Sequence, residues 1–188
     1  MFALLICTAA AGVAVGTGLA VAPSAFAQPE SPLVALVDAA AQRLQVAEPV
    51  AAFKFQTGGL IEDPDREQEV LQAAARDAAS RHIDPSYVTV VFRDQIDATV
   101  AIEYTRLAQW KFDPALAPSI APDLSSSRVA IDELNRVMVS EMADAWDALH
   151  SPTCAADLEA AKVVAVQAHA MDPLYQQALD LATGNYCR

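Results

Sequence analysis

Basic residues are scarce in this sequence, and most familiar catalytic motifs are missing from it. Its 188 residues include 12 Lys and Arg against 24 Asp and Glu, which gives a net charge of −12. So acidic a chain lacks the basic footprint that binds nucleic acid or anionic membrane surfaces. The sequence also lacks a G-x-S-x-G elbow, a glycine-rich phosphate loop and an H-E-x-x-H zinc helix. These absences argue against several enzyme classes, and they make any inward-facing group of basic residues informative.

Histidine and cysteine are also few, and their spacing does not suit a metal. His82, His150 and His169 fall on different predicted helices or turns, so we interpret them as surface or capping residues. Neither Cys154 nor Cys187 has a second Cys or a suitably placed His nearby, which argues against a zinc site. We therefore expect no zinc site in this protein.

The first 27 residues contain no charged side chain and read as an export signal. An apolar run is followed by the small-residue pattern Ala25-Phe26-Ala27, which predicts a signal peptide over 1–27 and a single mature domain over 28–188. Because no Lys or Arg precedes this run, two alternatives stay open: the true start lies upstream, or the segment is kept as a membrane anchor. With the signal removed we expect no stable membrane association, and a location in the cell envelope or outside the cell.

The positions of the proline residues in the mature chain predict an all-α, single-domain bundle of about six helices. Five pairs of a Ser or Asp followed by Pro are typical of helix starts. Glu48-Pro49 should kink or restart the first helix, and Gly58-Gly59 should end it. The predicted helices cover about 32 into the fifties, 63–81, 85–111, 123–150, 152–171 and 173–187.

The last two predicted helices should form an αα-hairpin closed by a disulfide. Cys154 opens the first of them and Cys187 closes the second, so antiparallel packing brings the two thiols together. Because Cys7 lies in the predicted signal, the mature chain keeps an even pair of cysteines, which suits an exported protein in an oxidising compartment.

The helix predicted over 85–111 carries two polar residues where apolar ones are expected. At about 100° per residue, Thr99 and Glu103 fall inside an apolar arc. A carboxyl group directed at a core is unfavourable unless it has a partner. Two interpretations are open: a core Thr beside a Glu paired to a neighbouring helix, or the wall of a polar cavity. The apolar residues of the arc are Phe92, Ile96, Val100, Leu107 and Trp110.

Basic residues on the other helices can complement this face. Arg43 and Lys54 lie eleven residues apart, which is three helical turns, and so project from nearly the same face. Arg66 falls in the first turn of the next helix, and Arg128 stands beside the apolar stripe of the 123–150 helix. Each of these residues alone could be an exposed side chain. Together they suit a small dianion, because guanidinium groups bind carboxylates in a bidentate manner.

Several stretches resemble the exported, all-helical chorismate mutases of the AroQ type, gamma subclass, across nearly the whole mature chain. They are LVDAAAQRLQVAEPVAAFK (36–54), IED…R (61–66), HIDPSYVTVVFRDQIDATVAIEY (82–104), PDLSSSR (122–128) and the Cys154/Cys187 pair. The resemblance implies an isomerase that converts chorismate to prephenate without a cofactor, and a homodimer. An alternative from another class is a non-catalytic exported binding protein that keeps the fold.

Carried onto this sequence, the resemblance implies a role for each charged residue. Three arginines, Arg43, Arg66 and Arg128, would bind the carboxylates of chorismate with help from Thr99. Lys54 and Glu103 would flank the ether oxygen, and Asp63 would reach the ring hydroxyl unless it serves only as an N-cap. Where the family pattern has an amide side chain one turn after Arg66, this chain has Val70.

The implied reaction suits a site without a nucleophile. The rearrangement is unimolecular and pericyclic, so an enzyme needs only to hold the reactive conformer and to stabilise negative charge on the ether oxygen. Glu103 can donate a hydrogen bond to that oxygen only when protonated. We therefore expect burial to raise its pKa, against the opposing effect of Lys54.

Overall fold

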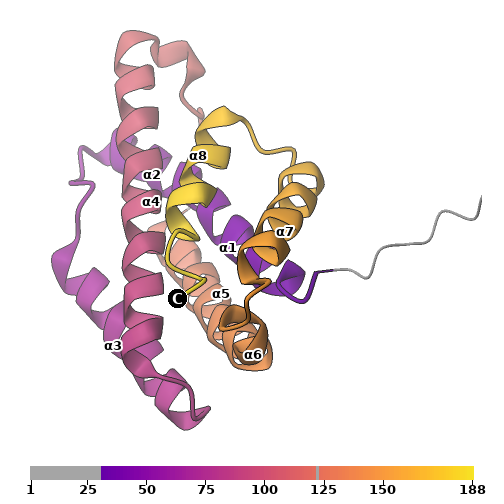
Figure 1. The fold of residues 1–188 in the computed structure, drawn as a ribbon. Coiled ribbons are helices and arrows are strands. Elements are labelled where there is room, and N and C mark those ends of the chain that lie inside the picture. The colour runs from indigo at the N-terminus through magenta and orange to yellow at the C-terminus, as the bar shows by residue number, and fades with distance from the viewer. Residues whose placement is uncertain (1–30, 122) are drawn as a thin grey trace, which may run out of the picture.

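The computed structural model describes residues 31–121 and 123–188, and within these ranges it contains helices and no strand. The predicted signal segment lies outside the described residues. No helix in the described part of the chain is both long and apolar enough to cross a membrane. The elements are α1 (Val34–Gln45), α2 (Ala47–Thr57), α3 (Pro64–Ser80), α4 (Pro85–Phe112), the short 3₁₀ helix η1 (Pro114–Leu116), α5 (Leu124–Asp144), α6 (Trp146–Leu149), α7 (Cys154–Ala168) and α8 (Pro173–Ala182) (Figure 1).

The six predicted helices are all present, and two of them are interrupted. Val46 separates α1 from α2, so the first helix restarts just before Pro49, as the sequence suggested. Ala145 separates α5 from α6. Gly58 ends α2 in the left-handed conformation, with φ of 69°. Such a φ is favourable mainly for glycine, and it turns the chain toward α3.

Three of the five predicted helix starts are confirmed, and two are wrong. The carboxyl groups of Asp63, Asp84 and Asp172 each accept a hydrogen bond from a backbone N–H in the first helical turn. Ser31 and Ser151 do not cap helices. Each begins a turn instead, in which its carbonyl accepts from the N–H three residues later, and the helices begin only at Val34 and Cys154.

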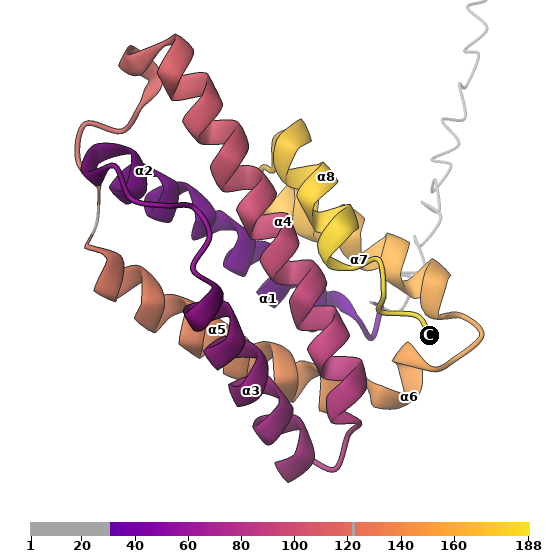
Figure 2. The same ribbon diagram turned by 90° about the vertical axis from the view of Figure 1, so that its left-hand side faces the viewer.

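The long helix α4 extends along most of the molecule and is buried on more than one side (Figures 1 and 2). It packs against α2, α3 and α8, while α1 packs against α5 and α7 (Figures 1 and 2). The predicted apolar arc is therefore only part of its buried surface. Val88, Ala98 and Ile102 are also fully buried, whereas Val100 and Leu107 are only partly buried. A single apolar arc does not describe the whole buried surface of α4, because this helix has neighbours on several sides.

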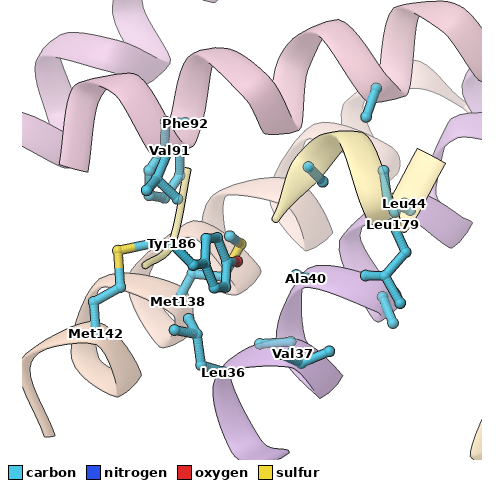
Figure 3. Packing of buried hydrophobic residues seen from close by; sticks show 14 of the residues in the cluster. Leu36, Val37, Ala40, Leu44, Val91, Phe92, Met138, Met142, Leu179 and Tyr186 are labelled. Atoms are coloured by element: carbon cyan, nitrogen blue, oxygen red, sulfur yellow. The ribbon is translucent and has the colours of Figure 1, made fainter. Parts of the chain in front are cut away.

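The core lies between α1, α4, α5 and the C-terminal segment. Figure 3 shows the ring of Tyr186 inserted among side chains of these helices, including Leu36, Phe92 and Met138. Tyr186 is completely buried although it follows the last helix. The backbone carbonyl of Tyr186 accepts a hydrogen bond of 2.5 Å from Tyr87 Oη.

The predicted disulfide is present and holds this terminal segment in place. Cys154 and Cys187 are bonded, with a Cα–Cα distance of 5.6 Å. An ion pair of 2.6 Å between Lys162 and Asp180 also joins α7 to α8. Both helices otherwise pack on the rest of the bundle, α7 on α1 and α8 on α4.

Candidate active site

A cavity of about 530 Å³ lies where α1, α2, α3, α4 and α5 approach one another. Its volume is in the range of small-molecule sites, about 300–1,000 Å³. The connection between α2 and α3 forms part of its wall, and Figure 2 shows this segment descending from the end of α2 to the start of α3. All seven residues predicted for the site line this cavity: Arg43, Lys54, Asp63, Arg66, Thr99, Glu103 and Arg128.

Lys54 and Glu103 form an ion pair in the wall of the cavity. Lys54 Nζ lies 2.8 Å from Glu103 Oε2 and also donates to the carbonyl of Ile61 at 2.5 Å. Glu103 is only 4% exposed. Burial raises the pKa of Glu103, while the charges of Lys54 and Arg43 oppose that rise. Both interpretations of the Thr99/Glu103 face are therefore correct together: Glu103 is paired to a neighbouring helix, and the face lines a polar cavity.

Arg43 lies at the inner end of the site with its guanidinium group held by neutral partners. Its Nε donates to Asn135 Oδ1 at 2.7 Å and its Nη1 donates to Thr99 Oγ1 at 3.2 Å. Thr99 in turn donates to the carbonyl of Gln95, which fixes its hydroxyl group. Burial first, and then the like charge of Arg66, lower the pKa of Arg43 to about 10. Arg43 therefore remains a cation at neutral pH.

Arg66 and Arg128 are more exposed and have carboxylate partners. Arg66 pairs with Asp132 and, at 3.4 Å, with Glu69. Arg128 Nη2 lies 2.9 Å from Asp63 Oδ2. The other oxygen of Asp63 accepts from the backbone N–H of Arg66 at 3.2 Å, so this residue is both the N-cap of α3 and the partner of Arg128.

Sequence reasoning missed two polar residues of α5 that hold the site arginines. Asp132 pairs with Arg66, and Asn135 accepts from Arg43. A signal for Asn135 was available, because it lies on the same helical stripe as Ile131, Met138 and Met142. A buried amide on such a stripe needs a polar partner, just as Glu103 does on α4. No comparable signal distinguished Asp132 from the other surface acids.

The side chains of the cavity can bind an anion and stabilise negative charge, because four cations line it. Among its described lining residues there is no Ser, Cys or His that could act as a nucleophile or a histidine base. Within 31–121 and 123–188, no three His, Cys, Asp or Glu side chains are grouped to hold a metal ion. The histidines lie elsewhere: His82 and His150 are exposed, and His169 caps the end of α7. Val70 lines the cavity and supplies no hydrogen bond.

Three comparisons relate the chain to known proteins. Residues 34–104 match the family "Chorismate mutase type II". The chain is 60% identical over 166 residues to the secreted chorismate mutase of Mycolicibacterium smegmatis, covering 88% of this chain and 92% of the relative. It is 52% identical to the secreted chorismate mutase of Mycobacterium tuberculosis, covering 88% and 83%. The crystal structure of a chorismate mutase from Burkholderia phymatum is similar, with a TM-score of 0.80 at 26% identity over 85% of this chain and 98% of that one.

Proposed function

We propose that the cavity lined by α1, α2, α3, α4 and α5 is the active site of this chain, which belongs to the family of the secreted chorismate mutases and converts chorismate to prephenate. The observation that carries the proposal is the convergence of four cations on one cavity in a protein of net charge −12. Chorismate is a dianion, and the individual cations can bind it by exchanging their partners. The lining as a whole carries no net charge, because Glu62, Asp63, Glu67 and Glu103 also face the cavity.

The three arginines bind the carboxylates of the substrate. Arg43 is buried and has no carboxylate partner among residues 31–121 and 123–188, so its charge is available to one carboxylate. Arg66 and Arg128 are paired with Asp132 and Asp63 near the opening. A substrate carboxylate can replace these aspartates by a bidentate contact. Released from Arg128, Asp63 can accept a hydrogen bond from the ring hydroxyl.

Lys54 and Glu103 act on the ether oxygen. During the reaction this C–O bond breaks while a new C–C bond forms, and negative charge develops on the oxygen. The ammonium group of Lys54 stabilises that charge, and a protonated Glu103 donates a second hydrogen bond to it. Such groups are effective because they are already oriented in the cavity wall before the reaction begins. The reaction needs no external proton, electron or leaving group, since substrate and product are isomers.

The test of this function is direct. Residues 28–188 are purified in the oxidised form and incubated with chorismate, and prephenate is identified by nuclear magnetic resonance. We expect one prephenate for each chorismate lost, without any added cofactor. A matched control is Lys111→Ala, which removes a cation from the exposed end of α4 that does not line the cavity. An intact, disulfide-bonded protein that leaves chorismate unchanged would overturn the proposal.

We also propose that the protein is exported after removal of residues 1–27. The uncharged apolar run and the Ala25-Phe26-Ala27 pattern support this cleavage, and the described disulfide suits an oxidising compartment. Mass spectrometry of the protein recovered from culture medium and envelope fractions should give an N-terminus at or near Gln28. A chain that retains its first 27 residues in the membrane fraction would contradict the proposal.

A homodimer is proposed as the functional assembly. Support comes from large apolar side chains that are exposed near the end of α4 and in the following connection: Phe112, Leu116 and Ile120. Apolar surface of this kind is stabilised when a second copy covers it. Light scattering at several protein concentrations should give twice the mass of the mature chain, and Phe112→Asp should shift it toward the monomer. A monomer at every concentration would refute the dimer.

A further inference from the structure

Helix α5 holds two arginines of the site through residues that differ in charge. Asp132 and Asn135 lie three residues apart on this helix and so face the same side. Asp132 pairs with Arg66 near the opening, whereas Asn135 accepts from Arg43 in the interior. The outer partner is therefore a carboxylate and the inner partner is a neutral amide of nearly the same shape.

The neutral partner is unexpected from the energetics of burial. Arg43 is 4% exposed and Asn135 is 9% exposed. A buried cation is usually paired with a carboxylate, because its desolvation is otherwise uncompensated. Here the guanidinium group has only the amide of Asn135 and the hydroxyl of Thr99 as hydrogen-bond acceptors in the described chain. Asn135 occupies the position that a carboxylate would take in an ion pair with Arg43, but its amide carries no charge.

We infer that Asn135 is a positioning residue for Arg43, and that its neutrality keeps the charge of Arg43 free for a carboxylate of the bound dianion. The inference rests on the proposed function of the cavity. An amide orients Nε and leaves the remaining guanidinium nitrogens directed toward Thr99 and the cavity. A carboxylate at the same position would neutralise Arg43 and compete with the ligand for it. Burial and the like charge of Arg66 lower the pKa of Arg43 to about 10, although the charges of Asp132 and Glu103 oppose this fall, so its charge is only partly compensated.

The test compares two substitutions at this position. Asn135→Asp keeps the shape and the acceptor but adds a charge, and Asn135→Ala removes the acceptor. The matched control is Gln177→Glu, which adds the same charge on an exposed position of α8. Affinity for prephenate is measured by calorimetry, so that the result does not depend on turnover. Chorismate turnover and thermal unfolding are measured in parallel.

For Asn135→Asp we expect the Kd for prephenate and the KM for chorismate to rise about 10- to 100-fold, the size of one charge-assisted hydrogen bond. The melting temperature should be equal to or above that of the wild type, because the new carboxylate pairs with Arg43. For Asn135→Ala we expect a loss of up to about 100-fold in kcat/KM, because Arg43 is no longer oriented. Gln177→Glu should change neither ligand binding nor turnover.

Three results would overturn the inference. One is an Asn135→Asp protein that binds prephenate as tightly as the wild type. Another is an Asn135→Ala protein with a lower melting temperature but unchanged kcat/KM, which indicates a structural role alone and applies even if the Asp variant does not fold. A third is an equal rise in Kd for Gln177→Glu, which indicates an effect of net charge. Failure of the proposed function is distinguishable, since it would abolish wild-type turnover.

Discussion

At the scale of single residues, opposing effects set the pKa of Glu103. Burial favours its neutral form, whereas Lys54 at 2.8 Å and the charge of Arg43 favour its ionised form. The net result is a pKa above the ordinary value of 4.5. The folded protein therefore binds this proton more tightly than the unfolded chain does. The contribution of Glu103 to stability is present at low pH and is lost as pH rises from 4.5 through the raised pKa.

The same shift predicts a pH dependence of the rate. Protonated Glu103 donates to the ether oxygen, so turnover should fall as pH rises through the raised pKa. Glu103→Gln keeps a donor at every pH, and its rate should be nearly constant over the range where the wild type declines. The measurement is kcat/KM for both proteins from acid to mildly alkaline pH. A flat wild-type profile would show that Glu103 does not act as a hydrogen-bond donor.

A second prediction at this scale concerns Val70. This residue lines the cavity one turn after Arg66 and supplies no polar group to the site. Val70→Gln adds an amide that can bond a substrate oxygen, and a hydrogen bond to a charged group contributes about 1.5 kcal/mol or more. The KM for chorismate should fall roughly tenfold. Val70→Leu is the apolar control. An equal KM for the Gln and Leu variants would show that the amide does not contribute to chorismate binding.

At the scale of elements, the junction after α2 shows how local conformation positions a functional side chain. Gly58 has φ of 69°, and a Cβ added there meets no atom within 4 Å. Gly58→Ala should therefore destabilise the protein by about 1–2 kcal/mol through backbone strain alone. Gly59→Ala is the matched control, because its Cβ would make only ordinary contacts, the nearest at 3.5 Å.

The free energy of unfolding of Gly58→Ala and of Gly59→Ala is measured by urea unfolding. Since Lys54 lies one turn before Gly58 and donates to Ile61 beyond the turn, Gly58→Ala should also lower kcat. An equal free energy of unfolding for the two variants would contradict the role given to the left-handed conformation.

Element boundaries were predictable where the local chemistry was decisive. Each Asp-Pro pair began a helix, because the carboxyl group accepts from a backbone N–H in the first turn. Ser31-Pro32 and Ser151-Pro152 carry the same pattern but form turns, and the helices begin later. The periodicity of α4 identified only part of its buried surface, for a different reason. A helix with neighbours on several sides, as α4 has, shows no single apolar face.

At the scale of the whole molecule, the disulfide links the C-terminal segment to the core. Its two cysteines are separated by 33 residues, and closing a loop of this size stabilises a fold by about 3–4 kcal/mol in the chain-entropy model. Reduction should also release Tyr186, which is buried just before Cys187. We expect the Cys154→Ser/Cys187→Ser double variant to lose roughly this much stability in urea unfolding. A loss below about 1 kcal/mol would show that packing of Tyr186 alone holds the segment.

The site was predictable from the sequence only in part. Thr99 and Glu103 were visible because they break the apolar pattern of one helix. Helical spacing proposed the cations that face them, and the resemblance then implied a role for each. The position of Asn135 on an apolar stripe was a signal that it has a partner, but the partner, Arg43, lies 92 residues away and could not be identified from that stripe. Periodicity places a residue on a face of its own helix, but it does not say which side chain from another helix lies opposite. The pairing of Asp63 with Arg128 was missed for the same reason.

The most direct test of the site is the kcat for chorismate of Lys54→Ala, measured by ultraviolet absorbance beside the wild type and Lys111→Ala. Lys54 is the cation placed to meet the charge that develops on the ether oxygen. Its loss should therefore lower kcat by about 10²–10³ or more, while circular dichroism shows an intact helical fold. Lys111→Ala should match the wild type. A folded Lys54→Ala protein whose kcat lies within a few-fold of the wild type would contradict the proposed mechanism.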